Sequence, residues 1–315
     1  MDLALKPKPL IVIVGPTAVG KTALSIDLAK HFNAEIISGD SMQVYKKMDI
    51  GTAKITPEET EGIPHHMLDI LEPSEVFNAI KFKTLAEEKI DDILSRDHLP
   101  MVVGGTGLYV NGLIYDYEFT GDRDATYRDK IYDALKQNND TTSYQELIAL
   151  RPDLEGIIFP GDHFRIARAL EIIKTNGKDA LKNFDMKSNY FSPYNLCLIG
   201  LNMDRATLYE RINRRVDIMI ENGLVEEVEM LLHQGYNKEM LAFKAIGYKE
   251  IIAYLNHDLS YEAAVDLLKK NTRHFAKRQL TWFRRDPNIK WFMVDEMDYP
   301  TLLSTTINYI EDTIN

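Results

Sequence analysis

The stretch Gly15-Pro16-Thr17-Ala18-Val19-Gly20-Lys21-Thr22 decides the fold. An apolar run, Leu10 to Val14, precedes it and predicts a buried strand, and the amphipathic segment Ala23 to Lys30 follows it and predicts a helix. The pattern G-x-x-x-x-G-K-[ST] between a strand and a helix is typical of a phosphate-binding loop. Backbone N–H groups of such a loop, together with the helix N-terminus, surround phosphate oxygens. We expect Lys21 to contact those oxygens and Thr22 to ligate Mg²⁺.

The composition narrows the class of protein. A chain of 315 residues can form one large domain or two smaller ones. Its net charge of −11 argues against a purely electrostatic nucleic-acid binder, although an enzyme can still concentrate positive charge in one region. The single cysteine, Cys197, excludes an internal disulfide and a cysteine zinc cluster. No apolar run is long enough for a signal peptide or a membrane span, so we expect a cytoplasmic protein without membrane association. We also expect a monomer.

A carboxylate follows the second predicted strand, Ala34 to Ser38, which ends at Gly39-Asp40-Ser41. In an open α/β sheet the carboxyl ends of the strands face the ligand. We therefore expect Asp40 beside the phosphate-binding loop. The alternative is that Asp40 only caps the segment that follows, since Asp and Ser are common in that role.

A later strand, starting at Pro100, ends in Gly104-Gly105-Thr106 and leads into another helix. Many nucleoside triphosphatases place an aspartate at such a strand end to help hold Mg²⁺. Here glycines allow the backbone to approach a ligand closely, and Thr106 offers a hydroxyl. The missing aspartate argues against a standard ATPase.

The segment 117–193 differs from the rest of the chain, because charged helical stretches at 125–136, 143–150 and 163–175 follow one another without a strong strand. It predicts a helical insertion domain in an α/β core formed by 1–116 and 194–315, with helices at the C-terminal end of that core. Arg165 and Arg168 share a face of one of these helices. For any single arginine, exposure to solvent is the plainer interpretation.

Two further stretches concentrate positive charge. Arg211 and Arg215 share a face of a helix predicted from Arg205 to Glu221, where they suit a phosphate or, alternatively, salt bridges with Glu210 or Asp217. A long helix predicted from Tyr261 to Arg284 carries seven basic residues and no acid between Lys269 and Arg285. Aromatic residues lie among them, a combination that suits phosphate contacts and base stacking, although some of these rings can belong to the core.

Six motifs together carry a resemblance to a known family. They are Gly15 to Thr22, Ile37 to Ser41, Met48-Asp49-Ile50-Gly51-Thr52-Ala53-Lys54, Val103 to Thr106, Arg168 to Glu171, and Lys277-Arg278-Gln279-Leu280-Thr281-Trp282-Phe283-Arg284. In this order the chain resembles the tRNA dimethylallyltransferase (tRNA isopentenyltransferase) family in its bacterial form, from about Leu10 to Arg285. The phosphate-binding loop alone is shared by many families, whereas its combination with M-D-I-G-T-A-K and K-R-Q-x-T-W is specific. The resemblance implies an α/β fold: a P-loop NTPase-like parallel sheet flanked by helices, with an inserted all-helical domain.

The resemblance also implies a reaction and a set of site residues. The family transfers a dimethylallyl group from dimethylallyl diphosphate to the exocyclic amine of the adenosine just 3′ of the tRNA anticodon, and Mg²⁺ assists the departure of diphosphate. Asp40 would be the general base, with Thr17, Lys21, Arg211 and Arg215 completing the catalytic set. The diphosphate would bind to Gly15, Pro16, Thr17, Ala18, Val19, Gly20, Lys21 and Thr22, with Thr22 on the metal. The anticodon stem-loop would contact Asp40, Ser41, Met42, Gln43, Thr106, Arg128, Phe164, Arg165, Ile166, Ala167, Arg168, Lys244, Gly247, Lys249, Lys277, Arg278, Gln279, Trp282 and Arg284. Phe164 departs from the family, which more often has Gln at this position.

The residues alone leave two other classes of protein to be considered. An ATP-dependent small-molecule kinase could use the same loop, but the Gly-Gly-Thr strand end and the basic C-terminal helix argue against it. A non-catalytic RNA-binding protein would have no need of Lys21, Thr22 and Asp40 together.

Overall fold

The computed structural model describes residues 7–115, 117, 119, 124–138, 141–181 and 190–314. These residues divide between two compact units, one drawn from 1–116 and 192–315 and the other from 117–191. The larger unit contains the sheet and has the elements β1 (Lys8–Val14), α1 (Lys21–Phe32), β2 (Ala34–Ser38), β3 (His65–His66), α2 (Ala79–Ser95), β4 (Leu99–Gly104), α3 (Gly107–Ile114), β5 (Tyr194–Asn202), α7 (Arg205–Glu221), α8 (Leu224–His233), a 3₁₀ turn (Leu241–Lys244), α9 (Tyr248–Leu255), α10 (Tyr261–Phe283), β6 (Lys290–Met293) and α11 (Tyr299–Ile314). The smaller unit has α4 (Ala125–Asn138), α5 (Thr142–Leu150), α6 (His163–Asn176) and the 3₁₀ turns Pro152–Leu154 and Lys178–Leu181.

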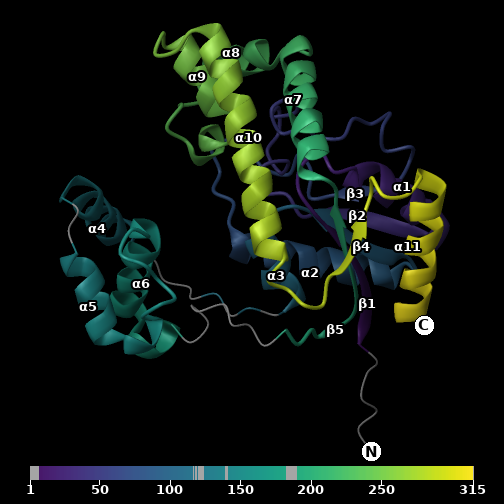
Figure 1. Ribbon diagram of the computed structural model, residues 1–315, viewed down its shortest axis with the longest axis horizontal. Helices are drawn as coiled ribbons and strands as arrows, with labels where there is room; N and C mark the ends of the chain where they lie inside the picture. Colours follow the sequence, from purple (N-terminus) through teal and green to yellow (C-terminus); the bar gives the residue numbers. More distant parts are fainter. Residues whose placement is uncertain are drawn as a thin grey trace, which may run out of the picture. The chain divides into compact units, whose positions relative to one another are not determined.

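The sheet of the larger unit is parallel throughout, with the strand order β3-β2-β4-β1-β5-β6. Leu10 to Val14 of β1 are fully buried, as expected for a central strand with helices over both faces. The predicted class, a P-loop NTPase-like α/β sheet flanked by helices, is confirmed. Figure 1 shows α1 and α11 close together beside the sheet, while α7, α8, α9 and α10 gather at the top of the view. The parallel order brings the carboxyl ends of β1, β2 and β4 to one edge, where the site is built.

Short polar side chains fix where several helices begin. Asn78 accepts hydrogen bonds from the N–H groups of Ile80 and Lys81 at the start of α2, and Asp204 does the same for Ala206 and Thr207 at the start of α7. Ser260 caps α10 through the N–H of Ala263. The helices predicted from Arg205 and from Tyr261 therefore begin where the sequence places them.

The smaller unit has its own hydrophobic core. Leu135 of α4, Leu147 of α5 and Ile166 of α6 are fully buried in one cluster, which is separate from the core around the sheet. None of the helices within the described ranges combines the length and apolarity needed to cross a bilayer.

Candidate active site

The phosphate-binding loop lies between β1 and α1, as predicted. Gly20 ends the loop with a φ of 107°, a left-handed conformation that glycine adopts without steric cost. The Lys21 ammonium folds back and donates to the carbonyl oxygens of Gly15 at 2.9 Å and Pro16 at 2.8 Å. The Thr22 side chain is exposed at the first turn of α1. An anion bound here would meet both a lysine and the amino end of a helix.

Asp40 lies two residues after the end of β2, where its side chain stabilises a tight turn. Its Oδ1 accepts hydrogen bonds from the N–H groups of Met42 at 2.7 Å and Gln43 at 3.3 Å. The turn passes very close to the end of β4, because a Cβ on Gly104 would lie 2.4 Å from the carbonyl oxygen of Gly39. Glycine at position 104 thus allows the two strand ends to meet.

Thr106 joins the Asp40 turn to the end of β4. Its hydroxyl oxygen accepts from the N–H of Ser41 at 3.2 Å, and it donates to the Ser41 hydroxyl at 3.4 Å. The Gly-Gly-Thr strand end therefore supports the turn that presents Asp40.

Lys21, Arg215 and Asp40 form one electrostatic cluster. Burial lowers the pKa of Lys21 to about 7, the neighbouring Arg215 cation contributes to that lowering, and the Asp40 carboxylate opposes both effects. Burial also lowers the pKa of Arg215, against the carboxylates of Asp40 and Glu59. Two desolvated cations beside one carboxylate make a site that favours a doubly charged anion.

The two arginines of α7 differ in their surroundings. The Arg215 guanidinium is partly buried and donates to the carbonyl of Ala53 at 3.4 Å. Arg211 lies one turn earlier with an exposed side chain, and it is not among the groups that shift the pKa of Lys21. The structure brings Arg215 to the loop, and the place of Arg211 near the diphosphate stays a prediction.

Gln279 of α10 connects the phosphate-binding loop to the Gly-Gly-Thr strand end. Its Oε1 accepts from the N–H of Thr17 at 2.9 Å, and its Nε2 donates to the carbonyl of Gly105 at 3.0 Å. The side chain is only 6 % exposed, and a Cβ on Gly105 would lie 2.1 Å from Nε2. Sequence reasoning missed this bridge. Its signal was a glutamine in the buried stripe that Ala276 and Phe283 also occupy on the same helix.

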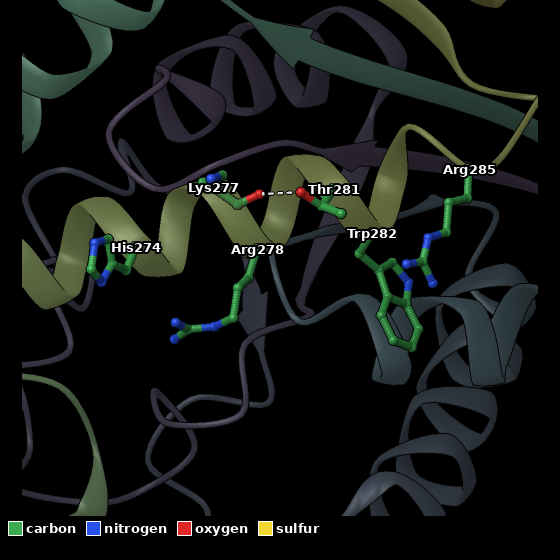
Figure 2. Close-up of a pocket in the computed structure, with 6 residues that line it drawn as sticks. All are labelled: His274, Lys277, Arg278, Thr281, Trp282 and Arg285. Carbon is green, nitrogen blue, oxygen red and sulfur yellow. Dashed lines mark hydrogen bonds between the residues drawn. The ribbon is translucent and has the colours of Figure 1, made fainter. Parts of the chain in front are cut away.

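The opposite face of α10 is exposed, basic and hollowed. A cavity of about 540 Å³ is lined by His274, Lys277, Arg278, Thr281, Trp282 and Arg285. Figure 2 shows Arg278 and Trp282 pointing to the same side of the helix. The Trp282 ring packs on Gly107 at the start of α3, where a Cβ would lie 2.3 Å from the ring. This face combines cations with an accessible aromatic edge beside the Gly-Gly-Thr loop.

Three residues expected to contact tRNA have buried side chains, and their contact with tRNA stays a prediction. Ile166 and Ala167 are fully buried in the smaller unit, and Gln279 uses both ends of its amide inside the protein. Within the chain itself these side chains serve packing, for Ile166 and Ala167, and the connection of two loops, for Gln279.

The arginines of the smaller unit have intramolecular partners. Arg128 pairs with Asp129 at 2.8 Å, Arg165 with Asp162 at 3.6 Å, and Arg168 with Glu171 at 2.6 Å. Each of the three arginines is thus paired with a carboxylate of its own unit, whereas the plainer interpretation from the sequence was exposure to solvent; their contact with tRNA stays a prediction. Phe164 is 58 % exposed, in keeping with a side chain that could meet a partner.

The turn before α9 carries the remaining expected contacts. Lys244 and Lys249 are exposed on either side of the buried Gly247, whose φ is 102°. Lys249 lies 3.6 Å from the carboxylate of Glu250. The two lysines border a hollow of about 290 Å³ that Lys238 also lines.

Comparisons with known proteins assign the family. Residues 43–286 match the family model described as IPP transferase. The chain is 50 % identical over 284 residues to the tRNA dimethylallyltransferase of Carboxydothermus hydrogenoformans, covering 90 % of this chain and 91 % of that protein. It is 48 % identical over 286 residues to the tRNA dimethylallyltransferase of Bacillus subtilis, covering 90 % of each.

Solved structures agree with the sequence matches. The crystal structure of a full-length tRNA isopentenylpyrophosphate transferase from Bacillus halodurans matches with a TM-score of 0.75 and 44 % identity, over 98 % of this chain and 97 % of that one. A eukaryotic dimethylallyltransferase captured acting on tRNA matches with a TM-score of 0.78 and 30 % identity, over 97 % and 80 %. With a family model across most of its length and relatives close to half identical, this chain belongs to the IPP transferase family.

Proposed function

We propose that this enzyme transfers a dimethylallyl group from dimethylallyl diphosphate to the exocyclic amine of the adenosine 3′-adjacent to the anticodon in tRNA, releasing diphosphate. The observation that supports this most is the cluster of Asp40, Lys21 and Arg215 at one edge of the sheet. It sets a carboxylate beside the cations of an anion-binding loop. The names of the relatives supply the two substrates.

The cations stabilise the leaving group. As the bond between the allylic carbon and the oxygen breaks, negative charge grows on the diphosphate. The Lys21 ammonium, the Arg215 guanidinium and the N–H groups at the start of α1 surround that charge in a partly desolvated site, where their effect exceeds that in water.

Asp40 serves as the general base. The adenine amine is a poor nucleophile because its lone pair is delocalised into the ring, so removing its proton as the C–N bond forms accelerates the reaction. Within the described part of the chain, the hydrogen bonds to the Asp40 carboxylate come from two backbone N–H groups and both reach Oδ1. Oδ2 is thereby left for the amine.

The residues present fit a magnesium ion held mainly by substrate. Mg²⁺ keeps several waters and is bound through one or two protein oxygens plus phosphate oxygens. Thr22 offers an exposed hydroxyl beside the loop, while the described residues contain no group of three or more His, Cys, Asp or Glu that could form a cage. When bound there, Mg²⁺ would neutralise charge on the departing diphosphate.

The exposed face of α10 is the proposed main surface for the anticodon stem-loop. Lys277, Arg278, Trp282 and Arg284 provide cations and a stacking surface on the helix whose buried Gln279 supports the phosphate-binding loop. Lys244, Lys249, Arg128, Phe164, Arg165 and Arg168 remain proposed contacts. The enzyme is further proposed to act as a monomer.

Label transfer tests the function directly. Radiolabelled dimethylallyl diphosphate, unmodified tRNA and Mg²⁺ should yield label on one anticodon-loop adenosine, and ATP in a parallel reaction should stay intact. Turnover of ATP without label transfer would overturn the proposal in favour of the kinase alternative, which the matches to tRNA dimethylallyltransferases do not support.

The variant Asp40→Asn tests the role of the base. The amide oxygen can still accept from the N–H groups of Met42 and Gln43, so the turn should be kept. We expect turnover to fall roughly 10²–10⁴-fold with tRNA affinity almost unchanged. Asp312→Asn, at an exposed position of α11, is the matched control. Turnover near that of the wild type would remove Asp40 from this role.

A further inference from the structure

Glu227 of α8 is a buried carboxylate to which the proposed chemistry gives no part. Its Oε2 accepts from the N–H groups of Asp49 at 2.9 Å and Ile50 at 2.7 Å. Its Oε1 accepts from the N–H of Gly51 at 3.0 Å and from the Tyr248 hydroxyl at 2.6 Å. Three consecutive backbone N–H groups thus converge on one side chain, an arrangement that binds anions. The side chain is 7 % exposed, so these bonds are shielded from water.

The loop held by Glu227 is also fastened at its other end. The buried Lys54 ammonium donates to the carboxylates of Asp49 and Asp69, each at 2.6 Å, and to the carbonyl of Tyr45 at 2.8 Å. The loop packs directly on the ring of Tyr248, because a Cβ on Gly51 would lie 2.5 Å from that ring. Its backbone therefore has little freedom between residues 49 and 54.

Two carbonyl groups of the same loop support the site. Thr52 and Ala53 both accept from Nε2 of Gln43, each at 3.3 Å, and Ala53 also accepts from Arg215 at 3.4 Å. The N–H of Gln43 in turn donates to Asp40. Hydrogen bonds therefore connect Glu227, through the backbone of the loop, to Arg215, the proposed cation for diphosphate, and to Asp40, the proposed base.

We propose that Glu227 is a positioning residue: by holding the N–H groups of residues 49–51, it sets the carbonyls that orient Arg215 and Gln43. This inference rests on the proposed function of the site. Glu227 itself acts through the loop and has no contact with the reacting atoms. Its carboxylate accepts four hydrogen bonds from groups within the protein, which stabilise the negative charge.

The variant Glu227→Gln keeps the size of the side chain but turns an NH₂ group toward at least one backbone N–H. The loop must shift to relieve this contact, and Arg215 loses its fixed acceptor. We expect the Kd for inorganic diphosphate to rise about tenfold or more. Glu229→Gln, at an exposed position of the same helix, should leave the Kd within about twofold of the wild type.

A double-mutant cycle separates positioning from a purely structural role. In an Arg215→Ala background the guanidinium is gone, so adding Glu227→Gln should change the Kd by less than about threefold. Gly51→Ala provides a second route, because the new Cβ would collide with Tyr248 and move the loop while Glu227 is intact. We expect the same loss of binding, again dependent on Arg215.

Three results would overturn the inference: a folded Glu227→Gln enzyme with an unchanged Kd, a lower melting temperature as its sole effect, or effects that add fully to those of Arg215→Ala. The readout is equilibrium binding of diphosphate to the full chain. It stays informative if label transfer to tRNA fails, so a failure of the proposed function and a failure of this inference can be told apart.

Discussion

Lys21 shows how burial tunes a single residue. With its pKa lowered to about 7, the Lys21 side chain is about half protonated at neutral pH before an anion binds. A bound diphosphate favours the charged form, so binding should take up a proton. The unfolded chain keeps the ordinary value of 10.5, so it binds more protons than the native state between pH 7 and 10.5, and the Lys21 contribution to stability rises with pH across that window.

We therefore expect the affinity for diphosphate to fall as the pH rises above 7, by up to about tenfold per pH unit. Titration calorimetry in buffers of different ionisation enthalpy would count the protons taken up. Lys21→Arg, whose charge persists across this range, should bind with a shallower pH dependence. Equal proton uptake by both proteins would show that Lys21 is not the group that titrates.

At the scale of one element, α10 has two functional faces. Its buried face bridges the phosphate-binding loop and the Gly-Gly-Thr loop through Gln279, and its exposed face is basic and aromatic. A helix is stiff over such a distance, so a ligand on one face can bias the loops bound to the other. The element thus connects the proposed tRNA surface to the diphosphate site.

The substitution Gln279→Glu tests the buried face. A carboxylate can still accept from the N–H of Thr17, but it cannot donate to the carbonyl of Gly105, and it brings negative charge to the anion loop. We expect a loss of about 1–3 kcal/mol in the free energy of unfolding and weaker diphosphate binding. Gln145→Glu, exposed on α5, is the control for denaturation and binding. Unchanged diphosphate affinity would count against the bridge as a support of the loop.

At the scale of the whole molecule, charge is distributed unevenly. The chain carries a net charge of −11, yet the exposed face of α10 gathers cations around one hollow. Binding of tRNA to such a surface releases counterions, so affinity falls as salt rises. The rest of the protein surface is acidic and repels the phosphate backbone of RNA, which helps to confine the RNA to this region.

The paired substitution Lys277→Ala with Arg278→Ala should reduce the slope of log affinity against log salt by about 1–2, because each lost phosphate contact accounts for about 0.7–0.9. Binding of tRNA measured across a salt series gives the slope. Lys290→Ala, an exposed cation on β6, should leave it unchanged. A slope equal to that of the wild type would move the tRNA surface away from α10.

What the sequence determined by itself is local. The phosphate-binding loop, the helix starts and the buried strand of Leu10 to Val14 follow from short-range patterns, because capping, glycine conformation and apolar periodicity act over a few residues. Strand order at the carboxyl edge also placed Asp40 correctly beside the loop, since parallel strands share one ligand-facing edge.

Only the tertiary structure decided which distant groups meet. It brought Arg215 to the phosphate-binding loop, turned Gln279 inward, and set Glu227 against a loop 176 residues away in the chain. Spacing shows which residues share a helix face but not what that face packs against. The roles of these buried polar groups arise because each must find its hydrogen-bond partners once water is excluded, and those partners come from segments that only folding brings together.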